Sequence, residues 1–400
     1  MIPHLRRSYN AAFTEDKYKA FLQEIIRAAD GHRPRFHIAE TPIFVPKDMA
    51  GHLFQACEEI IDLITRPDFK ELSKGALLPE NFVPGETEHA AFLVFDFGIC
   101  EDENGNISPQ LIEVQGFPSL FVYQDLCARC YRRHFGIPNN MSHLFGGLNT
   151  EAYLEKLRRV IIGDSKPENV VLLEVAPNSQ NTQVDFWVTQ KALGIQVVDL
   201  ADLKVSGRDV FYIDGKGRKV AVERIFNRVI FDELVKTRGL KRDFYYQNEH
   251  NIRWVGHPHW FFRISKHTLP FLKSKYVPKT FSLGQMSSFP DNLDDYVLKP
   301  LYSFSGQGVL MRPTLKDIEA IPDGEKHNYI LQKKVKYMPL IETLDVQAKV
   351  EIRMMLVWED GAPRPEVVTN LVRLSKGEMV GVRYNKDKTW VGGSVGFFEE

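Results

Sequence analysis

YVLKPLYSFSGQG, residues 296–308, is the stretch on which the interpretation of the whole chain depends. Its first three residues predict a buried strand, and Lys299 stands where that strand ends. The small polar loop that follows contains glycine, which lets backbone N–H groups turn toward an anion. A lysine before such a loop adds a point charge for a phosphate group. The alternative is an ordinary strand and loop in which the lysine is solvated.

The composition is that of a globular protein with two or three structural units. The chain has 400 residues, of which 44% are hydrophobic and 26% are charged. Its net charge of −1 gives no general attraction to nucleic acid or to an anionic membrane. No apolar run approaches the roughly 18–20 residues of a membrane span, and the start MIPHLRRSYNAAF lacks the apolar core of a signal peptide. We therefore expect a cytoplasmic protein whose partners include neither nucleic acid nor a membrane.

The cysteines form one recognisable motif, a CxxC at Cys127 and Cys130. Such motifs occur in redox and zinc sites. There is no second CxxC and no histidine pair at zinc-finger spacing, and the surrounding segment has a helical pattern. We expect free thiols packed inside a reduced protein, with a redox or zinc protein as the alternative.

The order of the apolar patterns predicts an α/β (α+β) protein in four regions. They are a mainly helical region at 1–90, an acidic hairpin with helices at 91–165, a βαβ region at 166–290 and an α+β region at 291–400. The strands expected in the last region are 296–299, 309–312, 329–334, 350–358, 367–374 and 381–384. No sustained heptad marks an oligomer interface.

Residues 91–100 and 111–115 are apolar and flank the polar turn EDENGN, so they predict a hairpin. Asp96 and Glu113 lie inside these apolar strands. A carboxylate there is costly to bury unless an arginine, backbone N–H groups or a divalent cation satisfies it. A buried ion pair and a metal site are both open at this point.

Residues 169–175, 183–193 and 194–200 predict a strand, a helix and a parallel strand. The first loop of this unit contains Asn178, Ser179 and Asn181. Ligands of open α/β sheets bind at the carboxyl ends of the strands, where this loop would lie. Arg228 ends a later strand, and it and Ser119 are further candidates for substrate contacts.

Four stretches together resemble the ATP-grasp enzymes, in particular the circularly permuted branch of glutathione synthetase and glutathionylspermidine synthase-like proteins. They are VFDFGICEDENGNISPQLIEVQGFPSL (94–120), VVDLADLKVSGRDVFYIDGKGRKVAVERIFNR (197–228), the opening stretch with YILQKKV (329–335), and VEIRMMLVW, NLVRLSKG and WVGGSVGFF (350–358, 370–377 and 390–398). They are similar, in order, to the magnesium hairpin, the substrate-domain sheet, the lysine strand with its flap and adenine hinge, and the C-terminal segments that close the site. The resemblance covers roughly residues 90–400.

The resemblance implies an ATP- and Mg²⁺-dependent ligase that joins a small carboxylate or peptide to an amine through an acyl phosphate. Lys266 and Lys299 would bind phosphates. The flap would be Ser303, Ser305, Gly306, Gln307 and Gly308, and the adenine hinge would be Gln332, Lys333, Lys334 and Val335. Glu351 would meet the ribose or a metal, and the magnesium candidates are Asp96, Glu113 and Gln115. Arg373 and Lys376 would stabilise the transferring phosphoryl group.

Three positions depart from the family pattern. Gln115 stands where the branch has a metal-binding Asn, Phe117 where it has Asp, and Ser303 where it has a metal-binding Glu. The alternative function is therefore a catalytically impaired, nucleotide-binding or regulatory protein with the same fold. Simpler structural roles are also open: Lys266 solvated, Arg373 paired with Glu113 or Glu351, and the glycine pair at 392–393 in a hairpin turn.

Overall fold

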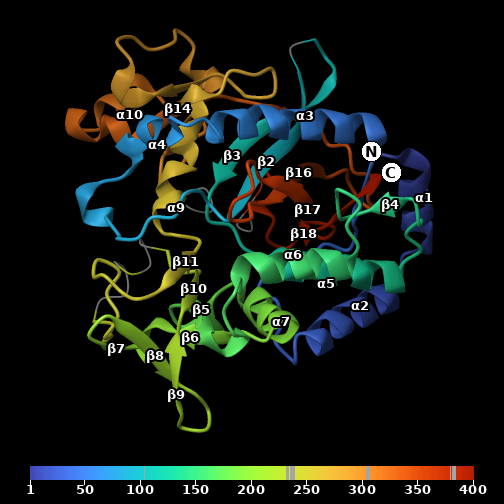
Figure 1. Cartoon of the computed structure of the whole chain (residues 1–400). Helices are drawn as coiled ribbons and strands as arrows, with labels where there is room; N and C mark the ends of the chain where they lie inside the picture. Colours follow the sequence, from blue (N-terminus) through green and yellow to red (C-terminus); the bar gives the residue numbers. More distant parts are fainter. Residues whose placement is uncertain (103, 231–233, 235–238, 303–306, 379, 381–383) are drawn as a thin grey trace.

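The computed structural model describes every residue except 103, 231–233, 235–238, 303–306, 379 and 381–383. The described residues form a mixed α+β protein with several sheets (Figure 1). No helix among them combines the length and the apolar character that crossing a membrane requires.

The described α-helices are α1 (Pro3–Ala12), α2 (Glu15–Ala28), α3 (Lys47–Ile64), α4 (Phe69–Leu72), α5 (Phe121–His134), α6 (Thr150–Ile161), α7 (Gln183–Leu193), α9 (His259–Arg263) and α10 (Leu315–Glu319). The short 3₁₀ helices are η1 (Lys74–Ala76), η2 (Pro79–Asn81), η3 (Pro167–Asn169), η4 (Pro177–Ser179), η5 (Leu200–Asp202), η6 (Lys266–Phe271), η7 (Leu283–Gln285), η8 (Leu293–Asp295) and η9 (Asp323–Asn328).

The described strands group into five sheets. The large sheet has the order β15 (Lys336–Tyr337), β2 (Phe92–Glu101), β16 (Lys349–Val357), β17 (Glu366–Ser375) and β18 (Gly392–Ser394), with β3 (Ile107–Gln115) paired to β2. The parallel sheet is β11 (Arg253–Val255), β10 (Arg224–Asn227), β5 (Val170–Glu174) and β6 (Gln196–Asp199). The small sheet is β12 (Thr280–Ser282), β14 (Tyr329–Lys333) and β13 (Tyr296–Pro300). The others are β7 (Lys204–Ser206), β8 (Asp209–Ile213) and β9 (Lys219–Val222), and β1 (Ile43–Val45), β19 (Gly396–Glu399) and β4 (Met141–Ser142).

The large sheet is covered by helices on both faces, α3 on one and α5 on the other (Figure 1). Alternate residues of β2 and β16, such as Phe97 and Ile352, pack in one core with the apolar stripe of α3. Val94 and Met355 pack in the second core with α5. Asp96 lies on the face of β2 opposite to Phe97. The alternation along the strand therefore places its charge on the same sheet face as the apolar Val94 and Met355.

The helical N-terminal region agrees with its sequence pattern. Thr14 caps α2 by accepting a hydrogen bond from the Lys17 N–H, and Phe21 and Ile25 of α2 pack in the core with α5. The region at 1–90, expected to be mainly helical, contains α1, α2, α3 and α4.

The expected βαβ unit is present as β5, α7 and β6, with the two strands parallel. Two further strands, β10 and β11, extend the same parallel sheet on the other side of β5. The hairpin β2–β3 is an antiparallel pair, as its polar turn predicts, and β8–β9 is a second antiparallel hairpin. All four cysteines are buried and free, which confirms the interpretation as packed thiols.

Two expectations for 291–400 need correction. Instead of a strand at 309–312, the structure has a single bridge between Leu298 and Leu310. The strands of this region also divide between the small sheet and the large sheet, because β14 pairs with β13 whereas β16 pairs with β2 of the hairpin. The expected strand 381–384 falls largely outside the described residues. The proposed domain boundaries stay a prediction.

Candidate functional site

Lys299 reaches from the small sheet to the large one. On β13 it lies diagonally across from Gln332 of β14, and its Nζ donates to Gln332 Oε1 at 2.5 Å. The same Nζ lies 3.4 Å from the carbonyl oxygen of Ile112. The β2–β3 register shifts between Asp96 and Phe97, so Ile112 is an extra, bulged residue outside the ladder. A bulge in the hairpin therefore provides the carbonyl that receives Lys299.

Burial lowers the pKa of Lys299 to about 8, and the nearby ammonium of Lys266 acts in the same direction. The carboxylates of Glu113 and Glu351 oppose this shift only in part. The buried side-chain Nε2 of Gln332 has no hydrogen-bond partner among the residues that the structure describes. An acceptor-rich anion at this point would satisfy both groups.

Lys266 approaches the same place from another element. It is the first residue of η6, and its Nζ lies 3.2 Å from Glu113 Oε1 and 3.4 Å from the carbonyl oxygen of Leu301. Gln115 Nε2 donates to the second oxygen of Glu113 at 2.9 Å. Lys266, Glu113 and Gln115 line a cavity of about 20 Å³, enough for one water molecule or ion. The predicted phosphate lysines and the predicted metal-binding Glu thus lie together.

Asp96 is held in a buried ion-pair network, the structural alternative considered from the sequence. Its two oxygens accept from Nε and Nη2 of Arg353 at 2.6 and 2.7 Å, and Arg373 also donates to it. Burial alone would raise the pKa of Asp96, but the two guanidinium groups outweigh it and hold that pKa below its usual value. With both oxygens engaged by arginines, Asp96 is not placed as a metal ligand.

Glu351 takes part in the same network. Its Oε1 accepts from Arg373 and its Oε2 from the Tyr337 hydroxyl at 3.0 Å. Burial raises the pKa of Tyr337, which keeps this hydroxyl protonated as a donor. Tyr337 fits here because Gly98 lacks a side chain; a Cβ on Gly98 would lie 2.6 Å from the tyrosine ring. Arg373 therefore pairs with Glu351, one of the two partners considered from the sequence.

The network and the two lysines form one charged cluster with an excess of positive charge. Its carboxylates are Asp96, Glu113 and Glu351, and its cations are Lys266, Lys299, Arg353 and Arg373. Glu113 raises the pKa of Arg373, and Lys299 feels both Glu113 and Glu351, so the members act on one another. Three carboxylates against four cations leave a site suited to an anion.

The donors present fit one magnesium ion shared with a polyphosphate, not an all-protein metal cage. The described residues contain no group of three His, Cys, Asp or Glu side chains arranged to hold a metal. Mg²⁺ is commonly held by one or two carboxylates together with phosphate oxygens. The candidate donors are Glu113 and the amide oxygen of Gln115, and a bound ion would have to replace the contacts of Glu113 with Lys266 and with Gln115 Nε2.

The predicted adenine hinge is partly engaged within the protein. The N–H of Lys333 donates to Lys279 O at 2.8 Å, and the N–H of Lys334 donates to Asp295 O at 2.7 Å. A base at this segment would have to use other backbone groups. Of the predicted flap, Gln307 and Gly308 are exposed, whereas Ser303, Ser305 and Gly306 lie outside the described residues.

Lys376 and the glycine pair have structural contacts. Lys376 Nζ pairs with Asp345 and lies 2.9 Å from Thr389 O. Gly393 belongs to β18 and is hydrogen-bonded through its backbone to His37 and Ala39. Gly392 has φ +108°, and a Cβ on it would lie 2.4 Å from His37 O. In this structure the pair is a strand packed on the N-terminal region, not the hairpin turn considered as the alternative.

The candidate substrate residues fall in two groups. Arg228 stacks on the Phe117 ring at 4.8 Å and donates to Pro118 O at 2.6 Å, and Phe117 lines the same cavity as Glu113. Arg228 and the loop containing Ser119 therefore adjoin the cluster. Asn178, Ser179 and Asn181 are exposed at the carboxyl end of β5, where Arg35 Nη1 reaches Ser179 O at 3.3 Å.

The sequence interpretation missed Arg353 and Tyr337. The sequence did contain a signal for Arg353, because this residue is two positions from Glu351 and therefore lies on the same face of β16. Tyr337 had none, since only the pairing of β15 with β2 brings it over Gly98.

Comparison with known proteins gives a single kind of support, at the level of the fold. No protein-family model and no curated protein matches the chain. Among solved structures, the chain is similar to a glutathione synthetase-like effector (GSS30) from Globodera pallida in its apo form. The TM-score is 0.58 with 11% identity, over 97% of this chain and 98% of that one. The two chains share their overall fold. At this identity the similarity extends no further than the arrangement of the α+β elements.

Proposed function

We propose that the protein is an ATP- and Mg²⁺-dependent carboxylate–amine ligase. The observation that carries the proposal is the meeting of Lys266 and Lys299 with Glu113, in a cluster whose cations outnumber its carboxylates. The glutathione synthetase-like fold of the similar structure is consistent with ligase chemistry. The substrate would be a small carboxylate or peptide and the co-substrate an amine.

The proposed reaction has two displacements. A carboxylate oxygen of the substrate attacks the γ-phosphorus of ATP, the bond to the β–γ bridging oxygen breaks, and ADP leaves. The amine nitrogen then attacks the acyl carbon, phosphate leaves, and the nitrogen loses a proton. Phosphoryl transfer of this kind depends on positioning and charge neutralisation.

The chain's own residues would supply most of that neutralisation. Lys266 and Lys299 would bind phosphate oxygens, and Glu113 with Gln115 would hold the magnesium ion, which supplies further positive charge to the polyphosphate. Arg373 would face the transferring group, because it is near enough to Glu113 for that carboxylate to act on its charge. Arg228 and Ser119 would contact the carboxylate substrate from the neighbouring loop.

A screen of phosphate release, acids against amines with Mg-ATP, tests the proposal. We expect release only when a matching acid and amine are both present, and its loss in Glu113→Gln. Silence across the screen, together with no ATP binding by calorimetry, would contradict the proposal.

A second candidate is a protein that binds nucleotide without turnover. It is favoured by the engagement of Asp96 and Glu351 with arginines, because of the three carboxylates in the described cluster only Glu113 has no hydrogen bond from an arginine. In that case ATP would raise the melting temperature without phosphate release, and Glu113→Gln would leave this stabilisation unchanged.

A further inference from the structure

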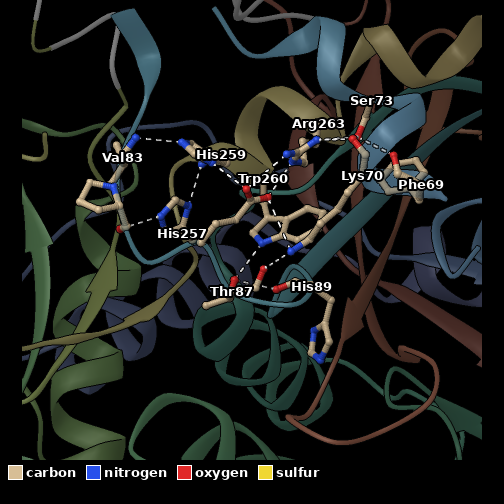
Figure 2. A network of polar contacts seen from close by, with 12 residues as sticks. Phe69, Lys70, Ser73, Val83, Thr87, His89, His257, His259, Trp260 and Arg263 are labelled. Atoms are coloured by element: carbon tan, nitrogen blue, oxygen red, sulfur yellow. Dashed lines mark hydrogen bonds and ion pairs between the residues drawn. The ribbon is translucent and has the colours of Figure 1, made fainter. Parts of the chain in front are cut away.

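A partly buried polar network joins α9, which ends three residues before Lys266, to residues 70–87 (Figure 2). Arg263, the last residue of α9, is three residues before Lys266. Its Nε lies 2.7 Å from Glu86 Oε1 and its Nη2 lies 3.2 Å from Glu86 Oε2. Its Nη1 donates to Lys70 O at 2.7 Å and to Ser73 Oγ at 3.1 Å. The guanidinium is thus fully directed at residues 70–86.

His259 fixes the other end of α9 to the same segment. Its Nε2 accepts from the Val83 N–H at 2.9 Å, so its Nδ1 carries the proton toward Glu86 Oε2 at 3.0 Å. Trp260 Nε1 donates to Thr87 Oγ1 at 2.8 Å. Burial would raise the pKa of Glu86, but its bonds to His259 and Arg263 lower it to about 2, so Glu86 is a carboxylate anion. One acidic side chain therefore joins both ends of a five-residue helix.

The opposite side of α9 is in contact with the hairpin strand that carries Glu113. The Gly116 N–H donates to Ile264 O at 2.8 Å. A Cβ on Gly116 would lie 2.4 Å from Trp260 O, so the two backbones touch. Between Arg263 and Lys266 the turn is also fixed, since Thr268 Oγ1 donates to Arg263 O and Ser265 Oγ to Phe262 O. A displacement of α9 would therefore move Lys266 relative to Glu113.

We propose that Glu86, acting through Arg263 and His259, is a positioning residue that sets the place of Lys266 against Glu113. The inference deepens the proposed function, on which it rests, and gives residues 69–89 a role in the site. Breaking a buried charge pair from one side leaves the other charge unpaired, so Glu86→Gln would release Arg263 from its place.

A double-mutant cycle tests whether Glu86 acts through Lys266. ATP affinity is measured by calorimetry for the wild type, Glu86→Gln, Lys266→Met and the double variant. We expect each single variant to weaken ATP binding on the order of tenfold, as the loss of a charge-assisted contact does. The double variant should bind no more weakly than Lys266→Met alone, because the two residues share one effect. Additive losses, or a folded Glu86→Gln that binds ATP like the wild type, would overturn the inference.

Two further variants keep the test decisive. Glu58→Gln removes one partner of the exposed Arg364 pair on α3 and should leave ATP affinity unchanged. Ser73→Ala removes one hydrogen bond to Arg263 and the bond from Ser73 Oγ to Phe69 O, and it tests the anchoring of Arg263 if Glu86→Gln does not fold.

A readout without nucleotide separates the inference from the proposed function. Lys266 is 8% exposed and paired, so acetic anhydride should label it slowly in the wild type and several-fold faster in Glu86→Gln. Failure of the wild type to bind ATP, with this difference in labelling present, would count against the proposed function alone. Equal labelling of Lys266 in the two proteins would overturn the positioning role.

Discussion

Nζ of Lys299 lies 2.5 Å from Oε1 of Gln332, across the pair of β13 and β14. This contact fixes the orientation of the amide, so that its Nε2, a donor, is left buried with no partner in the described part of the chain. Two donors side by side, in a place where burial disfavours the charge of one of them, mark a position that a bound anion would stabilise.

The first prediction concerns the pH dependence of ATP binding. Because the pKa of Lys299 is lowered to about 8, its ammonium is charged below that pH and neutral above it. We expect ATP affinity to fall as the pH rises from 7 to 9. Lys299→Arg should keep the charge and remove most of this slope. Calorimetric titrations of both proteins across this range provide the measurement, and a flat profile for the wild type would count against the role of Lys299.

The second prediction is that Lys299→Met stabilises the fold while weakening ATP binding. An unfolded lysine keeps its proton up to its ordinary value of 10.5, whereas the folded one loses it near 8. The unfolded chain binds more protons between these values, so this group's contribution to stability rises with pH through that window and is unfavourable at pH 7. We expect the melting temperature at pH 7 to rise by about 2–4 °C. Lys336→Met, at an exposed lysine, is the control; a lower melting temperature for Lys299→Met would refute the reasoning.

The third prediction is that Asp96 is structural. Asp96→Asn would leave Arg353 and Arg373 without their shared carboxylate, and we expect a loss of about 3–5 kcal/mol in the free energy of unfolding. Asp345→Asn, at the half-exposed partner of Lys376, should cost far less. Urea titration compares the two variants. If Asp96→Asn were as stable as the wild type and only its Mg²⁺ requirement changed, a metal-ligand role would be restored.

The fourth prediction concerns the contact between β3 and α9. Gly116→Ala places a methyl group against the Trp260 carbonyl, so the backbones must separate. We expect a lower melting temperature and weaker ATP binding. Glu113 is in the strand that leads to Gly116 and Lys266 follows α9, so separating the two backbones would separate this ion pair. Gly51→Ala in α3 has open space around the new methyl and should stabilise by about 1 kcal/mol. Unchanged ATP affinity in Gly116→Ala would show that the contact does not set the site.

The fifth prediction is that the CxxC has no chemical role. Burial raises the pKa of both Cys127 and Cys130, to about 12 for the latter, so neither is a reactive thiolate near neutral pH. In the folded protein both should resist a thiol reagent, and a double Cys→Ala variant should bind ATP as the wild type does. Rapid labelling before unfolding would revive the redox interpretation.

The sequence by itself determined the local elements and several members of the site. Apolar runs on either side of a polar turn placed Asp96 and Glu113 in strands, and the apolar pattern at 183–193 placed α7. The ordered motifs also predicted that Lys266, Lys299, Glu113 and Arg373 belong to one site. In the structure these four side chains affect one another's charge. Such features are local, since they depend on a few neighbouring residues.

Only the tertiary structure decided what each charge does. Alternation gives the face of a strand but not what lies opposite, and the partner of Asp96 depends on the register between β2 and β16. The bulge at Ile112, the approach of Tyr337 to Gly98 and the junction of Gly116 with α9 likewise join segments far apart in the chain. Whether a buried carboxylate meets an arginine or a cation is set by such contacts, because the cost of burying it depends on its immediate partners. The sequence could therefore nominate Asp96 and Glu113 alike, and the fold assigned one to an ion pair and placed the other beside two lysines.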